Sequence, residues 1–154
     1  MTLTRIKGDL FAVNKDYAFA HCISSDYAMG AGIAKAFTAM GTKSAILKVC
    51  GTPLIDSNGH TDRWEGIGYD IPVTVDGRRI FNLVTKERYY GKPTLKTMRE
   101  ALEHMRKHAV STGCTKIAMP LIGCGLDKLQ WKDVELLIKT VFGNTDIDIL
   151  VCSL

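Results

Sequence analysis

Two glycine-containing segments hold most of the residues in this sequence that could carry out chemistry. Residues 119–131 read Met-Pro-Leu-Ile-Gly-Cys-Gly-Leu-Asp-Lys-Leu-Gln-Trp, and residues 29–33 read Met-Gly-Ala-Gly-Ile. Each segment follows an apolar run typical of a β-strand and precedes a pattern typical of a helix. Glycine lets the backbone turn its N–H groups toward a ligand, and such a loop at a helix N-terminus suits a phosphate or pyrophosphate. The two segments together predict two walls of one anion-binding site.

Turn geometry alone is the competing interpretation of each segment. Short connections between strands and helices often use glycine for the turn itself, so one Gly-x-Gly loop is a weak signal. Neither segment is a dinucleotide-binding fingerprint, because the segment around Gly30 lacks the third glycine at the required offset. Neither is a Walker A loop, because no Gly-Lys-Ser/Thr follows. The presence of two such loops favours an anion site.

Lys86 and Asp127 each have an ordinary structural interpretation. Lys86 ends a β-rich run beside Glu87 and Arg88, as a solvated surface lysine often does. Asp127 starts the sequence Asp-Lys-Leu-Gln, which predicts a capping box with Asp127 as the N-cap and Gln130 at N3. Taken alone, neither residue indicates catalysis.

The cysteines and histidines near these segments give little sign of nucleophilic or metal chemistry. His21 and Cys22 are neighbours in a predicted strand, so their side chains point to opposite faces, as a buried histidine and a core thiol would. Cys124 lies at a predicted helix start, where a thiolate could be stabilised, but a small side chain that fits the loop is favoured. His104 and His108 have the spacing of a metal pair, yet they lie off the apolar stripe and lack a third ligand. We therefore predict surface histidines and no metal site.

Tyr89 and Tyr90 follow Lys86 directly. The two rings could pack on a ligand or cover the edge of a sheet, and the sequence does not separate these alternatives.

The pattern of apolar residues predicts helices interleaved with strands. Helices are predicted over residues 32–40, from Pro93 at N1 to Gly113 at C′, and after Asp127. Residues 42–68 are ambiguous, with a short strand or helix around 45–49 and a mobile surface loop in the middle. Strands are predicted at residues 2–7, 17–23, 69–75, 78–85, 116–119 and 147–152, with a hairpin at Asp76-Gly77. This order predicts an α/β fold with a mixed, mostly parallel sheet, in which ligands bind beyond the strand C-termini.

Composition narrows the class of protein. The 154 residues favour one domain. The net charge of +4 without any run of five like charges does not indicate a nucleic-acid-coating surface, and it would suit an anionic small ligand equally well. The five cysteines are an odd number with no Cys-x-x-Cys, which predicts free thiols in a cytoplasmic protein. We find no signal-peptide pattern and no apolar stretch long enough to span a membrane.

Six motifs between residues 8 and 131 resemble the macrodomain family, and more narrowly its terminal ADP-ribose protein glycohydrolase branch. The resemblance as a whole runs from about residue 6 to residue 154. The most specific is Gly-Cys-Gly-Leu-Asp-x-Leu-x-Trp, and residues 42–68 match least. The motifs are Gly8-Asp9-Leu10-Phe11, Ala20-His21-Cys22-Ile23-Ser24, Met29-Gly30-Ala31-Gly32-Ile33-Ala34, Leu83-Val84-Thr85-Lys86, Lys92-Pro93-Thr94 and residues 119–131.

The resemblance implies a three-layer α/β/α sandwich, with residues 1–154 as a single macrodomain that binds ADP-ribose. It implies that Asp9 accepts a hydrogen bond from the adenine amino group and that Ser24 lines the distal-ribose side. It also makes Lys86 the nucleophile and Asp127 the acid/base. The contacts it implies for ADP-ribose are Asp9, Leu10, His21, Ser24, Met29, Gly30, Ala31, Gly32, Ile33, Thr85, Ile122, Gly123, Cys124, Gly125 and Leu126.

The activity implied by the resemblance is removal of the terminal ADP-ribose from an acidic protein side chain or from a nucleobase, by an enzyme without a metal or organic cofactor. A monomer is expected, and the substrate is an ADP-ribosylated protein or nucleic acid. Three alternatives stay open: a phosphatase acting on ADP-ribose 1″-phosphate, deacylation of O-acetyl-ADP-ribose, and a non-catalytic ADP-ribose-binding module. The Lys86/Asp127 pair argues against a pure binding module, because binding needs neither residue.

Overall fold

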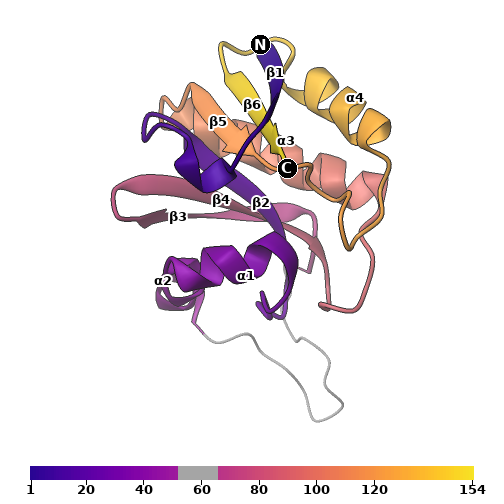
Figure 1. The fold of residues 1–154 in the computed structure, drawn as a ribbon. Coiled ribbons are helices and arrows are strands. Elements are labelled where there is room, and N and C mark those ends of the chain that lie inside the picture. The colour runs from indigo at the N-terminus through magenta and orange to yellow at the C-terminus, as the bar shows by residue number, and fades with distance from the viewer. Residues whose placement is uncertain (52–65) are drawn as a thin grey trace.

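A computed structural model describes residues 1–51 and 66–154, and within them a six-stranded sheet lies between two pairs of helices (Figure 1). The strand order is β1-β6-β5-β2-β4-β3. All neighbouring strands are parallel except the β3/β4 hairpin. The mixed, mostly parallel sheet and the three-layer α/β/α arrangement are therefore confirmed.

The strands follow the predicted positions closely. Their bounds are β1 Thr2–Lys7, β2 Ala18–Ser24, β3 Tyr69–Val75, β4 Arg78–Lys86, β5 Lys116–Met119 and β6 Asp148–Ser153. The hairpin turn is confirmed, because Asp76 and Gly77 both have positive φ (51° and 79°), as a two-residue type I′ turn requires.

The helices are α1 Gly32–Ala39, α2 Thr42–Cys50, α3 Leu95–Ser111 and α4 Trp131–Phe142, with a 3-10 turn, η1, at Leu10–Ala12. The ambiguity around residues 45–49 is resolved as helix α2. The predicted mobile loop lies in residues 52–65, outside the described residues.

The start of α3 differs from the prediction by two residues. Thr94 is the N-cap and accepts from the Thr97 backbone N–H, while the Thr97 hydroxyl accepts from the Thr94 N–H. This reciprocal capping box fixes the first helical residue as Leu95, so Pro93 precedes the cap instead of occupying N1. Gly113 follows the Thr112 C-cap with φ 72°, which confirms it at C′.

Alternate residues of strand β2 face two different hydrophobic cores. Ala18 and Ala20 face the core formed with α3 and α4, and Phe19 and Ile23 face the core formed with α1 and α2. Figure 1 shows these helix pairs on opposite sides of the sheet. The period of two confirms that His21 and Cys22 point to opposite faces. Among the described residues, no helix combines the length and hydropathy needed to cross a membrane.

Candidate active site

A cavity of about 1330 Å³ opens where the five parallel strands end. Its wall takes one residue or more from or just beyond the carboxyl end of each of these strands: Gly8, Ser24, Lys86, Pro120 and Ser153. Most of the remaining wall comes from residues 28–34 and 121–127, and smaller parts come from residues 9–11, 22–23, 36, 89, 152 and 154. Parallel strands bring their carboxyl ends to one edge of a sheet, so the topology itself gathers side chains that are distant in sequence.

Most of the predicted contact residues line this cavity. The exceptions are His21 and Thr85, which are fully buried in the sheet and are not among the lining residues. The residues that do line it are Asp9, Leu10, Ser24, Met29, Gly30, Ala31, Gly32, Ile33, Lys86, Ile122, Gly123, Cys124, Gly125, Leu126 and Asp127.

His21 lies instead in the layer between the sheet and α1. Its ring stacks on Phe37 at 3.8 Å between centroids, and Nε2 lies 2.6 Å from Asn82 Oδ1. Burial lowers the pKa of His21 to about 4, so its ring is neutral at physiological pH. Neither His21 nor Thr85 reaches the cavity, so the structure does not support a contact between either side chain and a ligand there.

The first glycine segment leads into helix α1 as predicted. The N-cap Ala31 makes no side-chain hydrogen bond to the first turn, so the N–H groups at this helix end have no side-chain cap. Because these N–H groups and the helix dipole favour negative charge, the end of α1 at the cavity suits an anion.

The second glycine segment is not at a helix N-terminus, and the prediction that Asp127 caps the next helix is wrong. Helix α4 begins at Trp131 with Gln130 as its N-cap residue. Lys128 has φ 62°, a left-handed conformation that a right-handed helix cannot include, and the Leu129 N–H donates to Gly123 O at 2.7 Å. The loop therefore closes on itself, and Asp127 faces another partner.

That partner is Lys86, 41 residues away along the chain. Lys86 Nζ lies 2.6 Å from Asp127 Oδ1, and each side chain is 13% exposed. Lys86 Nζ also donates to the Tyr89 carbonyl oxygen at 3.0 Å. An amine and a carboxylate at this distance can exchange a proton without moving, at a position open to the cavity.

Tyr89 and Tyr90 are 65% and 69% exposed, and their rings meet edge to face at 5.2 Å. Tyr89 is a lining residue of the cavity, which favours the ligand-side alternative for this ring. Lys92 Nζ donates to Leu126 O at 2.6 Å, which places the positive charge of this ammonium group beside the second glycine loop.

Left-handed backbone conformations gather around the cavity. Of the four non-glycine residues with positive φ among those described, Met29 lines it, Tyr27 lies in the turn just before its 28–34 wall, and Lys128 follows Asp127. Such conformations cost of order 1–3 kcal/mol each, and they persist where surrounding contacts hold them. This distribution supports a functional role for the cavity.

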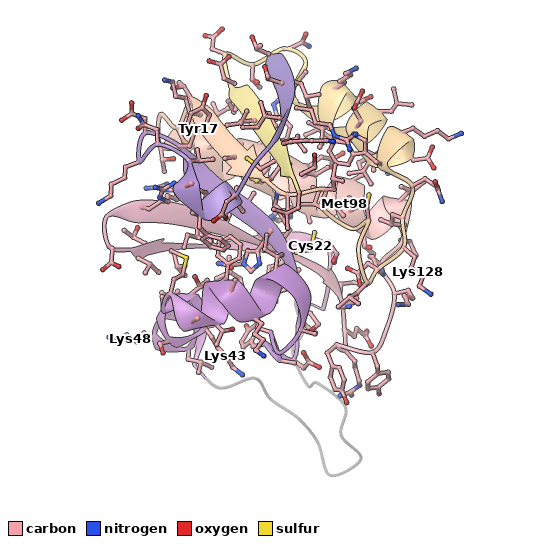
Figure 2. All side chains as sticks on the ribbon, viewed as in Figure 1. Tyr17, Cys22, Lys43, Lys48, Met98 and Lys128 are labelled. Atoms are coloured by element: carbon pink, nitrogen blue, oxygen red, sulfur yellow. The ribbon has the colours of Figure 1, made fainter. Side chains whose placement is uncertain are left out.

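The thiols in the wall are poorly suited to act as nucleophiles. Burial raises the pKa of Cys22, which lies near the centre of the view in Figure 2, and that of Cys124. A raised pKa keeps the thiol protonated, and the thiolate is the nucleophilic form. All five cysteines are free. No group of metal-binding side chains occurs within residues 1–51 and 66–154.

Two carboxylates that sequence reasoning missed have clear structural roles. Asp26 accepts hydrogen bonds from Ser24, Ala28 and Tyr89, and its spacing of two residues from Ser24 and Ala28 is the signal that could have indicated a turn. Asp70 is buried on β3 and lies 2.6 Å from His108 Nδ1. His108 on α3 therefore pairs with a carboxylate of strand β3 and is not an isolated surface histidine.

Comparison with known proteins agrees with this fold. Residues 20–138 match the family described as Macro domain. The chain is 40% identical over 153 residues to ADP-ribose glycohydrolase OARD1 of Homo sapiens, covering 99% of this chain and 91% of that protein, and equally to OARD1 of Bos taurus. The chain therefore belongs to the macrodomain family.

Solved structures resemble the fold at lower sequence identity. The macrodomain of Thermus aquaticus DarG has a TM-score of 0.78 and 21% identity, covering 98% of this chain and 97% of that one. The macrodomain of Mycobacterium tuberculosis DarG gives the same values. At this identity the likeness concerns the fold alone.

Proposed function

We propose that this protein is an ADP-ribosyl hydrolase that releases ADP-ribose from a modified acceptor. The observation that carries the proposal is the Lys86–Asp127 pair, 2.6 Å apart in the wall of the cavity. Binding ADP-ribose needs neither residue, whereas cleaving the bond at C1″ of its distal ribose needs a nucleophile and a group that moves protons. The 40% identity to an ADP-ribose glycohydrolase over nearly the whole chain supports the same activity.

The cavity has suitable groups for each part of ADP-ribose. Asp9 Oδ1 accepts from the Phe11 N–H at 2.9 Å, which leaves Oδ2 to accept from the adenine amino group. The N-terminus of α1 and the two glycine segments would hold the diphosphate. This arrangement directs the distal ribose to the side of Ser24, Lys86 and Asp127.

The reaction would proceed in two displacements at C1″. Lys86 first loses one proton to solvent, and its Nζ lone pair attacks C1″ while the bond from C1″ to the acceptor oxygen breaks, so that a carboxyl acceptor leaves as a carboxylate. Asp127 Oδ1 takes a proton from the new C1″–N ammonium along the existing hydrogen bond.

In the second displacement Asp127 returns this proton to Nζ. Water attacks C1″, the C1″–N bond breaks, and the proton of the attacking water restores the Lys86 ammonium. For a carboxyl acceptor, the sum is one water consumed, with ADP-ribose, a carboxylate and one proton formed.

We propose an acidic protein side chain or a nucleobase as the acceptor. Three substrates incubated side by side with the protein test this: a peptide with ADP-ribose on glutamate, ADP-ribosylated DNA, and ADP-ribose 1″-phosphate. Mass spectrometry should find free ADP-ribose with the peptide, the DNA or both. Phosphate release from the third substrate alone would indicate a phosphatase, and binding without any product would indicate a non-catalytic module.

A further inference from the structure

We infer that Asp26 is a positioning residue for the Lys86 nucleophile, acting through the backbone carbonyl of Tyr89. This inference rests on the proposed function, because it concerns how the attacking amine is oriented. Asp26 is not among the residues that line the cavity, so it has no direct contact with a ligand there. Its effect must pass through the groups that it holds.

The first step concerns the geometry at Lys86 Nζ. A tetrahedral amine nitrogen has three positions beyond its carbon. Two of them face acceptors, Asp127 Oδ1 at 2.6 Å and the Tyr89 carbonyl oxygen at 3.0 Å. When the amine is neutral, its two N–H groups donate to these oxygens and the lone pair takes the third position. The two acceptors together therefore set the direction in which Nζ attacks.

The second step concerns what holds the Tyr89 carbonyl. The Tyr89 N–H donates to Asp26 Oδ2 at 3.0 Å, across 63 residues of sequence. The other carboxylate oxygen accepts from Ser24 Oγ at 2.5 Å and from the Ala28 N–H at 3.0 Å. One carboxylate thus ties the turn after β4 to the turn after β2.

The third step shows that the hydrogen bond from the Tyr89 N–H to Asp26 positions Tyr89 and not the backbone of Lys86. The Ser25 N–H donates to Lys86 O at 2.9 Å, and Ser25 Oγ donates to Glu87 O at 3.0 Å. These bonds anchor residues 86 and 87 without using the Asp26 side chain. Loss of the Asp26 carboxylate should therefore free the Tyr89 carbonyl while Lys86 stays on its strand, and the amine loses one of its two orienting acceptors.

Two substitutions of Asp26 separate this role from a merely structural one. Asp26→Ala removes both oxygens. Asp26→Asn keeps one oxygen, which can serve the Ser24–Ala28 turn that asparagine favours, but it then presents its amide NH₂ to the Tyr89 N–H, donor against donor. Asn should therefore keep the turn and the thermal stability while it loses the tie to Tyr89. Asp16→Ala, the loss of an exposed carboxylate outside the cavity, is the matched control.

The experiment measures single-turnover release of ADP-ribose from a glutamate-linked peptide, ADP-ribose affinity by calorimetry and the midpoint of thermal unfolding. Both Asp26 variants should release ADP-ribose at least about tenfold more slowly, the scale of a misplaced reacting group. Their ADP-ribose affinity should stay within about threefold of the original. Asp16→Ala should match the unmodified chain, and Lys86→Ala should release nothing.

Each remaining outcome has a distinct meaning. Release at the original rate by both Asp26 variants, with Lys86→Ala inactive, overturns the inference and leaves the proposed function standing. Normal release by Asp26→Asn alone assigns the effect to the Ser24–Ala28 turn and also overturns it, as does a loss of ADP-ribose affinity equal to the loss of rate. Release by Lys86→Ala at the original rate overturns the assignment of Lys86 as the nucleophile, and the inference with it. An original chain that binds ADP-ribose and releases none from any acceptor overturns the proposed function itself.

Discussion

At the residue scale, the contact between Lys86 and Asp127 replaces the role that local sequence predicts for Asp127. Helix capping is decided by residues within one turn, whereas this ion pair joins residues 41 positions apart. No periodicity or spacing points to the pair, and only the family resemblance predicts it. The fold explains why the two residues meet. Strand β4 ends at Lys86, and the loop that carries Asp127 begins where β5 ends, at the same edge of the sheet.

Substitution of Asp127 should separate catalysis from stability. Asp127→Asn keeps an acceptor oxygen for Lys86 but cannot take up a proton as a carboxylate does, so release of ADP-ribose should be lost. Because Asp127 pairs with Lys86 and does not cap α4, the chain should stay folded and lose about 1–3 kcal/mol of unfolding free energy, the scale of a weakened hydrogen bond between charged groups. Denaturant unfolding and a release assay measure the two effects, with Gln130→Ala as the control at the actual N-cap position. Release of ADP-ribose at the original rate by Asp127→Asn would contradict the acid/base role of this carboxylate.

Asp70 should make stability depend on pH. Burial raises the pKa of this carboxyl from 3.8 to about 6, although His108 opposes the shift. Between these pH values the folded chain holds a proton that the unfolded chain has released, so this contribution to the unfolding free energy is complete below about pH 4 and is lost as the pH rises through about 6. Asp70→Asn has no such proton. From pH 4 to pH 7 its stability should rise relative to the original chain by on the order of 1–3 kcal/mol.

Denaturant unfolding of both chains across this pH range measures the joint contribution of Asp70 and its partner His108, since the remaining groups titrate alike in the two. A constant difference between the chains would show that Asp70 has an ordinary pKa in the folded state.

At the scale of elements, the hairpin, β5 and the end of α3 could be predicted because residues within a few positions decide them. Asp-Gly at 76–77 specifies its turn by backbone conformation alone, and Gly113 does the same for a helix end. The starts of α3 and α4 could not be predicted in this way. The Thr94/Thr97 capping box competes with Pro93, and the closure of the 123–129 loop delays α4 by tertiary contacts that the sequence pattern does not contain.

The two glycines of the second loop should respond differently to alanine. At Gly123, φ is 73°, and an added Cβ would lie 2.7 Å from Met98 Cε on α3 (Figure 2) and 3.0 Å from Leu129 Cδ1. Gly123→Ala should therefore cost roughly 2 kcal/mol of stability or more, from backbone strain and overpacking together. At Gly125 no protein atom lies within 4 Å of an added Cβ.

Gly125→Ala should therefore leave stability almost unchanged and weaken ADP-ribose binding, because the methyl group would enter the wall of the cavity. Thermal unfolding and calorimetry on both variants check this. Equal stability losses would show that Gly125 is also a structural glycine, and unchanged affinity in Gly125→Ala would remove this residue from the binding site.

At the scale of the whole molecule, the cavity forms because five parallel strands end together. The order of helices and strands along the chain predicts this class of fold, but the volume of the site and the distances within it depend on packing between segments that are far apart. His21 and Thr85 illustrate the limit: both lie in motifs that resemble the family, and the sheet buries both. A motif gives the neighbourhood of a site, and the fold determines which of its side chains reach the cavity.

ADP-ribose should bind with one-to-one stoichiometry, and tight binding should need adenine and diphosphate together. Asp9→Ala should weaken binding by about 1–3 kcal/mol, the scale of a lost hydrogen bond to a charged group. Calorimetry with ADP-ribose, adenosine and ribose 5-phosphate measures this, with Asp16→Ala as the control. An absence of heat with ADP-ribose at protein concentrations well above micromolar would contradict the assignment of the cavity.

The most direct test of the central claim is release of ADP-ribose from a glutamate-linked peptide by the original chain, Lys86→Ala and Lys86→Arg, with ADP-ribose affinity measured in parallel. If Lys86 is the nucleophile, both variants should bind ADP-ribose nearly as well as the original and release none, because a guanidinium stays protonated and cannot attack C1″. If Lys86 were only an electrostatic clamp, arginine would replace it at least in part. Substantial turnover by Lys86→Arg would therefore contradict the account.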